Sequence, residues 1–119
     1  MRWMGTERWW FVPASALRAL GEASQILAPV IPKDPTVGRI RELTTGVDWH
    51  GSVCLRGREL EALILDAGEL ARLALASPRL EARSAASLAY QARQLLLVVM
   101  EDAPLWMPAD ADDASLPSS

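Results

Sequence analysis

The sequence has very few of the residues that build disulfides, metal sites and catalytic triads. Its 119 residues include one cysteine, Cys54, and one histidine, His50. A disulfide framework within the chain and a multi-thiolate metal site are excluded, because both need several cysteines. Phosphate-binding loops, dinucleotide-binding loops, nucleophile elbows and two-histidine zinc motifs are also missing. We therefore expect no enzyme, no metal and no cofactor.

Lysine, net positive charge and long apolar runs are equally scarce. Eleven arginines stand against one lysine, Lys33, and the net charge is −3, which argues against a general nucleic-acid binder. The excess of arginine over lysine, together with nineteen alanines and eighteen leucines, is typical of a GC-rich coding sequence, as in an actinobacterium or one of its phages. The longest apolar run, 95–100, is far shorter than the ~20 residues that span a bilayer. We expect a cytoplasmic protein that makes no membrane contact.

What the sequence does contain is the composition of one globular domain. Half of the residues are hydrophobic and 23% are charged, and a chain of this length can bury a core of its own. Residues 1–108 are predicted to form a single helical domain. Residues 109–119 are small, acidic and rich in proline and serine, and are predicted to form a disordered tail.

Apolar residues recur at helical spacing in three segments, which predict helices over 13–28, 57–76 and 78–102. The predicted inner face of the second helix consists of Leu60, Leu63, Ile64, Ala67, Leu70, Ala71 and Ala74. The predicted stripe of the third consists of Ala85, Leu88, Ala92, Leu95 and Val99. Alanines in its first half let another helix approach closely. A short helical turn is expected at 37–43.

Two short runs of strand-forming residues, 8–12 and 52–55, precede the first and second helices. Both contain aromatic or β-branched residues and can pair as a two-stranded ribbon. The predicted fold class is therefore mainly α, a three-helix bundle-like domain with a short two-stranded β-ribbon. Residues 105–107 are expected to fold back onto the core as an apolar plug.

Five tryptophans stand against one phenylalanine and one tyrosine. They either cap the ends of the bundle or contact a partner, since tryptophan is enriched in binding hot spots. Trp9 and Trp10 are adjacent, so on a strand only one can enter a given core. Leucines outside the main helical stripes make the apolar side of the second and third helices wider than one neighbouring helix can cover. The predicted partner-binding residues are Trp3, Trp9, Trp10, Leu65, Leu73 and Trp106. We expect a homo-oligomer, most simply a dimer, acting as a regulator, inhibitor or assembly subunit.

The single histidine and cysteine lie close together in the segment Asp48 to Cys54. A nucleophilic cysteine would need a base and an oxyanion-stabilising surround. The simpler interpretation is a turn histidine and a buried cysteine that acts as a small hydrophobe.

The alternative function uses four arginines that flank this segment, Arg39, Arg41, Arg56 and Arg58. If they meet in space, they form a patch suited to phosphate groups. If they pair with the interleaved glutamates, they carry no such function. Because the chain is acidic, nucleic-acid binding is the second hypothesis and protein binding the first.

Overall fold

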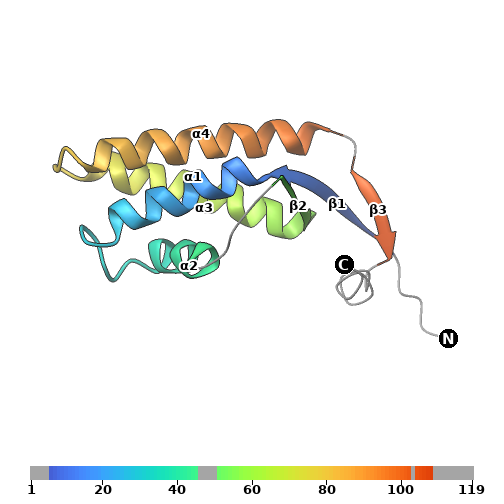
Figure 1. Ribbon diagram of the computed structural model, residues 1–119, viewed down its shortest axis with the longest axis horizontal. Coiled ribbons are helices and arrows are strands. Elements are labelled where there is room, and N and C mark those ends of the chain that lie inside the picture. Colours follow the sequence, from blue (N-terminus) through green and yellow to red (C-terminus); the bar gives the residue numbers. More distant parts are fainter. Residues whose placement is uncertain (1–5, 46–50, 103, 109–119) are drawn as a thin grey trace.

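The computed structural model describes residues 6–45, 51–102 and 104–108. The helices are α1 (Ala14–Leu27), α2 (Pro35–Thr44), α3 (Gly57–Ala76) and α4 (Ala82–Glu101), and the strands are β1 (Thr6–Pro13), β2 (Ser52–Arg56) and β3 (Leu105–Pro108). The fold is mainly α, with a short antiparallel sheet at one end of the bundle (Figure 1). The predicted fold class is thus confirmed.

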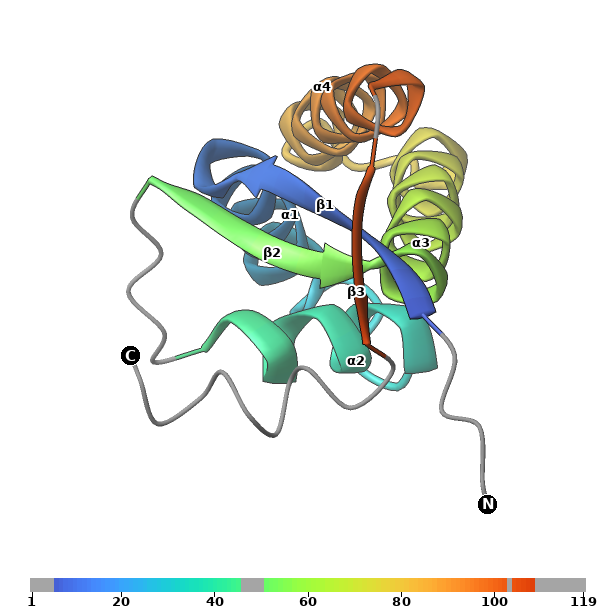
Figure 2. The ribbon, with the colours of Figure 1, turned by 90° about the vertical axis from the view of Figure 1, so that its right-hand side faces the viewer.

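The core is formed where α4 lies against α1 and α3. Viewed along the bundle axis, α4 lies over both α1 and α3 (Figure 2). The side of α4 that faces them is mostly alanine: Ala82, Ala85, Ala86, Ala89 and Ala92 are buried, followed by Leu96. Small side chains let the helix axes approach closely, as the alanine content predicted. The predicted inner face of α3 is buried at all seven positions.

The α4 helix differs from the prediction at its start and in its stripe. It begins at Ala82, and Ser77 is the C-cap of α3 instead of the start of the next helix. The Ser77 hydroxyl accepts a hydrogen bond from the Arg79 amide, so Ser77 and Pro78, where a capping serine followed by proline suggested a helix start, form a turn instead. Leu95 is 40% exposed while Leu96 is fully buried. The helix packs against both α1 and α3. Its buried residues are therefore centred closer to α3 than the predicted stripe is.

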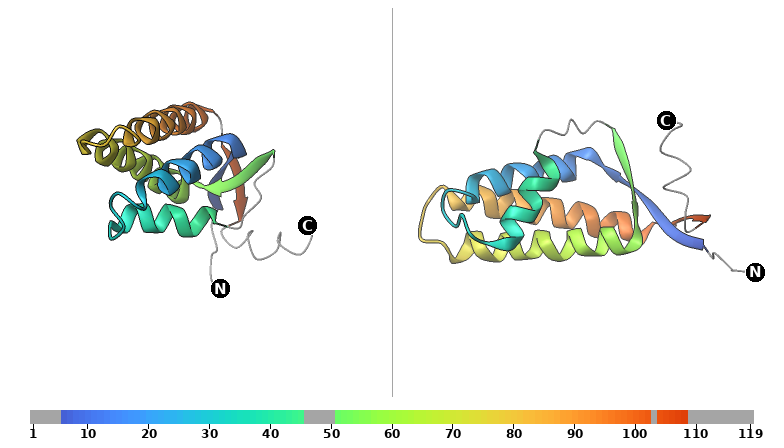
Figure 3. Two further views of the ribbon diagram at one scale, coloured as in Figure 1. Left: turned by 60° about the vertical axis from the view of Figure 1, so that its left-hand side comes forward. Right: turned by 90° about the horizontal axis from the view of Figure 1, so that it is seen from below.

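The expected short turn at 37–43 is a full helix, α2, which was not counted among the predicted principal helices. Asp34 caps it, accepting bonds from the amides of Thr36 at 2.9 Å and Val37 at 3.2 Å. Seen from below, α2 lies across the face formed by α1 and α3 (Figure 3). Gly21 of α1 permits this approach, because a Cβ there would lie 3.0 Å from the Thr44 Oγ1 atom.

The predicted ribbon is present, and a third strand joins it. The sheet order is β2-β1-β3, with both pairs antiparallel. In the first pair Trp10 lies opposite Leu55 and Phe11 opposite Cys54. Residues 105–107 are therefore part of a strand beside β1, and whether their side chains form the expected plug lies outside what the structure describes. The predicted tail, 109–119, lies outside the described residues.

The sheet has one face on the helices and one face away from them. Trp10 and Val12 of β1 belong to the core, and Val53 and Leu55 of β2 pack against it. The alternating residues Trp9, Phe11, Cys54 and Arg56 lie on the other face, as the strand period requires. Cys54 is partly buried there, so the expectation that it belongs to the core is wrong.

Candidate functional site

An open groove of about 500 Å³ lies between α2, β2 and α3. Its apolar lining comes from all three elements: Ile40 and Leu43 of α2, Leu55 of β2, and Ala62 and Leu63 of α3. Leu43 is 45% exposed and Ala62 is also exposed. The groove therefore offers apolar surface to a ligand, which is the usual character of a binding cleft.

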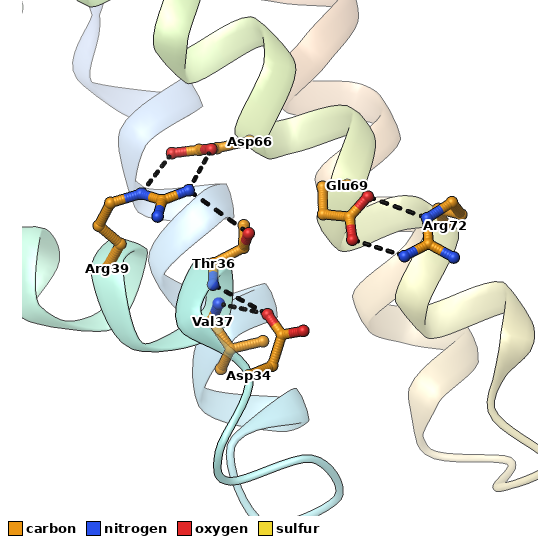
Figure 4. Close-up of polar contacts among 7 residues, drawn as sticks. All are labelled: Asp34, Thr36, Val37, Arg39, Asp66, Glu69 and Arg72. Atoms are coloured by element: carbon orange, nitrogen blue, oxygen red, sulfur yellow. Dashed lines mark hydrogen bonds and ion pairs between the residues drawn. The ribbon is translucent and has the colours of Figure 1, made fainter.

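One ion pair joins the two helices that border the groove (Figure 4). The Arg39 guanidinium donates to both carboxylate oxygens of Asp66, with an Nη2–Oδ1 distance of 2.8 Å and an Nε–Oδ2 distance of 3.4 Å. The same Nη2 donates to the Thr36 hydroxyl at 3.4 Å. The hydrogen bond with Asp66, and then its charge, raise the pKa of Arg39. This pair links α2 to α3 beside the groove.

The rim of the groove has more negative than positive charge. Glu42, Glu59 and Asp66 line it with a single cation, Arg39. Glu59 is held in place by the start of α3, where its Oε1 accepts the Arg56 amide hydrogen at 2.9 Å. The arrangement is an apolar surface beside an acidic edge. It fits an apolar segment that carries a basic residue.

The four arginines of the nucleic-acid hypothesis do different things. Arg39 is engaged by Asp66, and not by the interleaved glutamates. The Arg56 guanidinium lies 5.1 Å from the ring centroid of Trp9, on the sheet face away from the helices. Arg41 and Arg58 are exposed on α2 and at the start of α3.

The two adjacent tryptophans are both buried, on opposite faces of the sheet. Trp10 belongs to the core, and its indole N–H donates to the carbonyl of Asp102 at 3.0 Å. Arg8 lies 5.5 Å from the centroid of the Trp10 ring. Trp9 is only 6% exposed, and its buried indole nitrogen has no acceptor among the described residues. Trp10 therefore caps the bundle end.

The other predicted contact residues are scattered. Leu65 is 74% exposed on α3 and does not line the groove, although it lies one helical turn from Ala62. Leu73 packs against the core from a partly buried position. Trp106 lies in β3 opposite Arg8, and Trp3 lies outside the described residues. The described part of the molecule does not bring these residues together into one surface.

The cysteine–histidine segment is only partly described. Cys54 lies in β2, while Asp48 and His50 lie outside the described residues. Burial, and then the charge of Glu59, raise the pKa of the Cys54 thiol. A raised pKa disfavours the thiolate that nucleophilic catalysis needs. Among residues 6–45, 51–102 and 104–108, no group of three or more acidic, histidine or cysteine side chains could hold a metal.

Comparison with known proteins gives no further guidance. No protein-family model, no curated protein and no solved structure matches this chain significantly. The groove must therefore be judged by its own chemistry. Within the described part of the chain, no helix is both long enough and apolar enough to cross a bilayer.

Sequence reasoning missed the groove residues Leu43, Ala62 and Asp66. A leucine near the end of a short helix and an alanine on a long one carry no individual signal. The one usable clue was Asp34-Pro35, an N-cap followed by proline in the first turn. This signal predicts a helix at α2, and α2 forms one wall of the groove.

Proposed function

We propose that this chain is a non-enzymatic interaction module that binds a partner protein through the groove between α2 and α3. The observation that carries the proposal is the solvent-accessible apolar lining, with Leu43 and Ala62 exposed beside an acidic rim. A partner segment with apolar side chains and a neighbouring lysine or arginine matches both features. Such a module acts by occupying part of its partner's surface, as a small cytoplasmic regulator, inhibitor or assembly subunit of actinobacterial or phage type.

The test is a site-specific photo-crosslink made in cells of the source organism. A photoreactive phenylalanine analogue replaces Leu43 in the groove, and in a separate control it replaces the exposed Gln25 of α1. We expect a discrete heterologous adduct from position 43 and none from position 25. Equal adducts from both positions would contradict specific docking in the groove.

A matched pair of substitutions on α3 locates the contact. Ala62→Arg places a long side chain in the groove, whereas Leu75→Arg places the same side chain near the far end of the helix, where no residue lines the groove. Both wild-type positions are exposed, so both variants should fold. We expect Ala62→Arg to abolish the position-43 adduct and Leu75→Arg to preserve it. The opposite result would contradict binding in the groove.

Nucleic-acid binding remains the alternative hypothesis. Exposed Arg41 and Arg58 favour it, while the engagement of Arg39 by Asp66 weighs against a single four-arginine patch. Arg56→Ala with Arg58→Ala should abolish a salt-sensitive DNA gel shift if the alternative is correct. Under the groove hypothesis these changes leave the position-43 adduct intact.

A further inference from the structure

The outward side of α4 differs in charge from the other exposed helix faces. From Ser84 to Val98 its exposed residues are all uncharged: Ser84, Ser87, Tyr90, Gln91, Gln94, Leu95 and Val98. The single charged residue in this span, Arg93, is partly buried with its side chain close to Gly68 of α3. The exposed positions of α1, α2 and α3 include Arg18, Glu22, Arg39, Arg41, Glu42, Arg58, Glu61 and Arg72. A surface without charge costs less to desolvate than a charged one when a protein covers it.

The spacing of these residues fits a second helix. Ser84, Ser87, Gln91, Gln94 and Val98 recur at intervals of three, four, three and four. This is the spacing of a helix–helix seam. Leu95, 40% exposed, and Val98, 59% exposed, add apolar area at one end of the seam. In Figures 1 and 2 no other described element lies over this side of α4.

The charges at the two ends of the seam indicate which helix fits. Arg83 precedes the seam and Glu101 follows it, and both are exposed. They are eighteen residues apart, about five helical turns, so they lie on the same flank of α4. When two copies of this helix pack antiparallel, flanks of the same side meet, and Arg83 of each copy comes near Glu101 of the other. In a parallel pair these opposite charges stay about 27 Å apart along the axis.

We propose that the outer face of α4 pairs with the same face of a second copy, antiparallel, about a twofold axis near Gln91. This register places Ser84 opposite Val98 and Ser87 opposite Leu95, so each small residue faces a larger apolar one. Tyr90 lies on the flank of Arg83 and Glu101, where it meets Tyr90 of the second copy near the axis. The interface is isologous, as a twofold dimer requires. The groove lies on the other side of the bundle, so dimer formation through α4 can be tested independently of partner binding in the groove.

The decisive experiment is a charge exchange followed by analytical ultracentrifugation of the full chain. Arg83→Glu and Glu101→Arg each turn two attractive contacts per dimer into repulsive ones. We expect each single variant to raise the dimer Kd by about tenfold. The double variant restores the pairs with signs reversed and should return the Kd close to that of the wild type. Circular dichroism checks whether all three variants stay folded.

A disulfide test fixes the register independently. In a Cys54→Ser background, Gln91→Cys places two cysteines at the twofold axis, and mild oxidation should give a covalent dimer. Ser87→Cys is the matched control, because antiparallel packing holds the two introduced thiols apart, whereas parallel packing would join both pairs. A monomer at all concentrations, a double variant as weak as the singles, or crosslinking through position 87 would each overturn the proposal.

Discussion

The two ends of the helical bundle are closed in different ways. At the sheet end, Trp10 of β1 reaches the start of α3 and the end of α4, which are far apart in sequence. At the other end, local turns close the chain. The amides of Val30 and Ile31 donate to the Leu27 carbonyl at 2.9 and 2.8 Å. One end therefore depends on a single large side chain and the other on several short-range contacts, and their responses to mutation should differ.

The largest expected effect is the loss of the side chain that closes the sheet end. Trp10→Ala removes a buried indole and leaves the Asp102 carbonyl without its donor, and we expect unfolding to become easier by about 3–5 kcal/mol. The control is Phe11→Ala on the same strand, 57% exposed on the opposite face, which should cost at most about 0.5 kcal/mol. Urea denaturation followed by circular dichroism measures both. Equal losses would mean that the sheet end does not depend on Trp10.

The second prediction tests the contact between Trp10 and Gly57. A Cβ at Gly57 would lie 2.9 Å from the Trp10 ring, and the buried ring has little room to move. Gly57→Ala should therefore destabilise by about 1–3 kcal/mol.

The control for Gly57 is another helical glycine, Gly38 of α2. Beyond the adjacent residues and the backbone of its own helix, no atom lies within 4 Å of a Cβ added there, so Gly38→Ala should stabilise by about 0.5–1 kcal/mol through its helix propensity. If the clash explains the Gly57 effect, combining Gly57→Ala with Trp10→Ala will cost less than the sum of the two. Strict additivity would contradict this explanation.

At the turn end, the expected effects are smaller. Asp34→Ala removes the cap of α2 and should cost about 1 kcal/mol. Asp34→Asn keeps an acceptor oxygen, so its free energy of unfolding should stay within a few tenths of a kcal/mol of the wild-type value. Thermal or urea unfolding distinguishes the two variants. If alanine and asparagine behave alike, the cap does not stabilise α2.

The smallest effect concerns Cys54, on the outer face of the sheet. Because the folded protein raises its thiol pKa, iodoacetamide should react with native protein only at higher pH than with a free thiol. Glu59→Gln removes one cause, keeps the helix cap and should move the rate curve to lower pH.

The same pKa shift sets the sign of the effect on stability. The unfolded thiol ionises first as the pH rises, so the contribution to stability is full below the ordinary thiol pKa. It is lost as the pH rises through the raised value, and Cys54→Ser should remove this alkaline loss. A native thiol as reactive as a free one would contradict the assignment.

Local signals predicted the long helices well. The α3 helix has the predicted bounds because its apolar period is uninterrupted between Gly57 and Ser77. The central part of α4 was equally evident from its alanines. Its start was misplaced because Ser77-Pro78 fits a turn as well as a helix start. The sequence alone cannot distinguish these, since the choice depends on how α3 ends.

Features that depend on distant contacts were less predictable. β3 is a run of four residues whose partner lies about a hundred residues away along the chain. The α2 helix is short, and its place depends on Asp66 and on the space beside Gly21. The groove combines three elements, so no single pattern could indicate it. The burial of Trp9 and Trp10 on opposite faces follows from the sheet register, whereas Leu65 on α3 stays exposed.

The central position of β1 in the sheet has a consequence for how the chain is made. During synthesis β1 emerges first, its partner β2 follows some forty residues later, and β3 comes after all four helices. One edge of the first strand therefore has no β3 to pair with until nearly the whole domain has left the ribosome. The α3–α4 hairpin closes a short loop and should form early, whereas pairing the two ends of the domain closes a long one. The sheet, and the packing of Trp10 against the helices beneath it, should accordingly be the last part of the molecule to form.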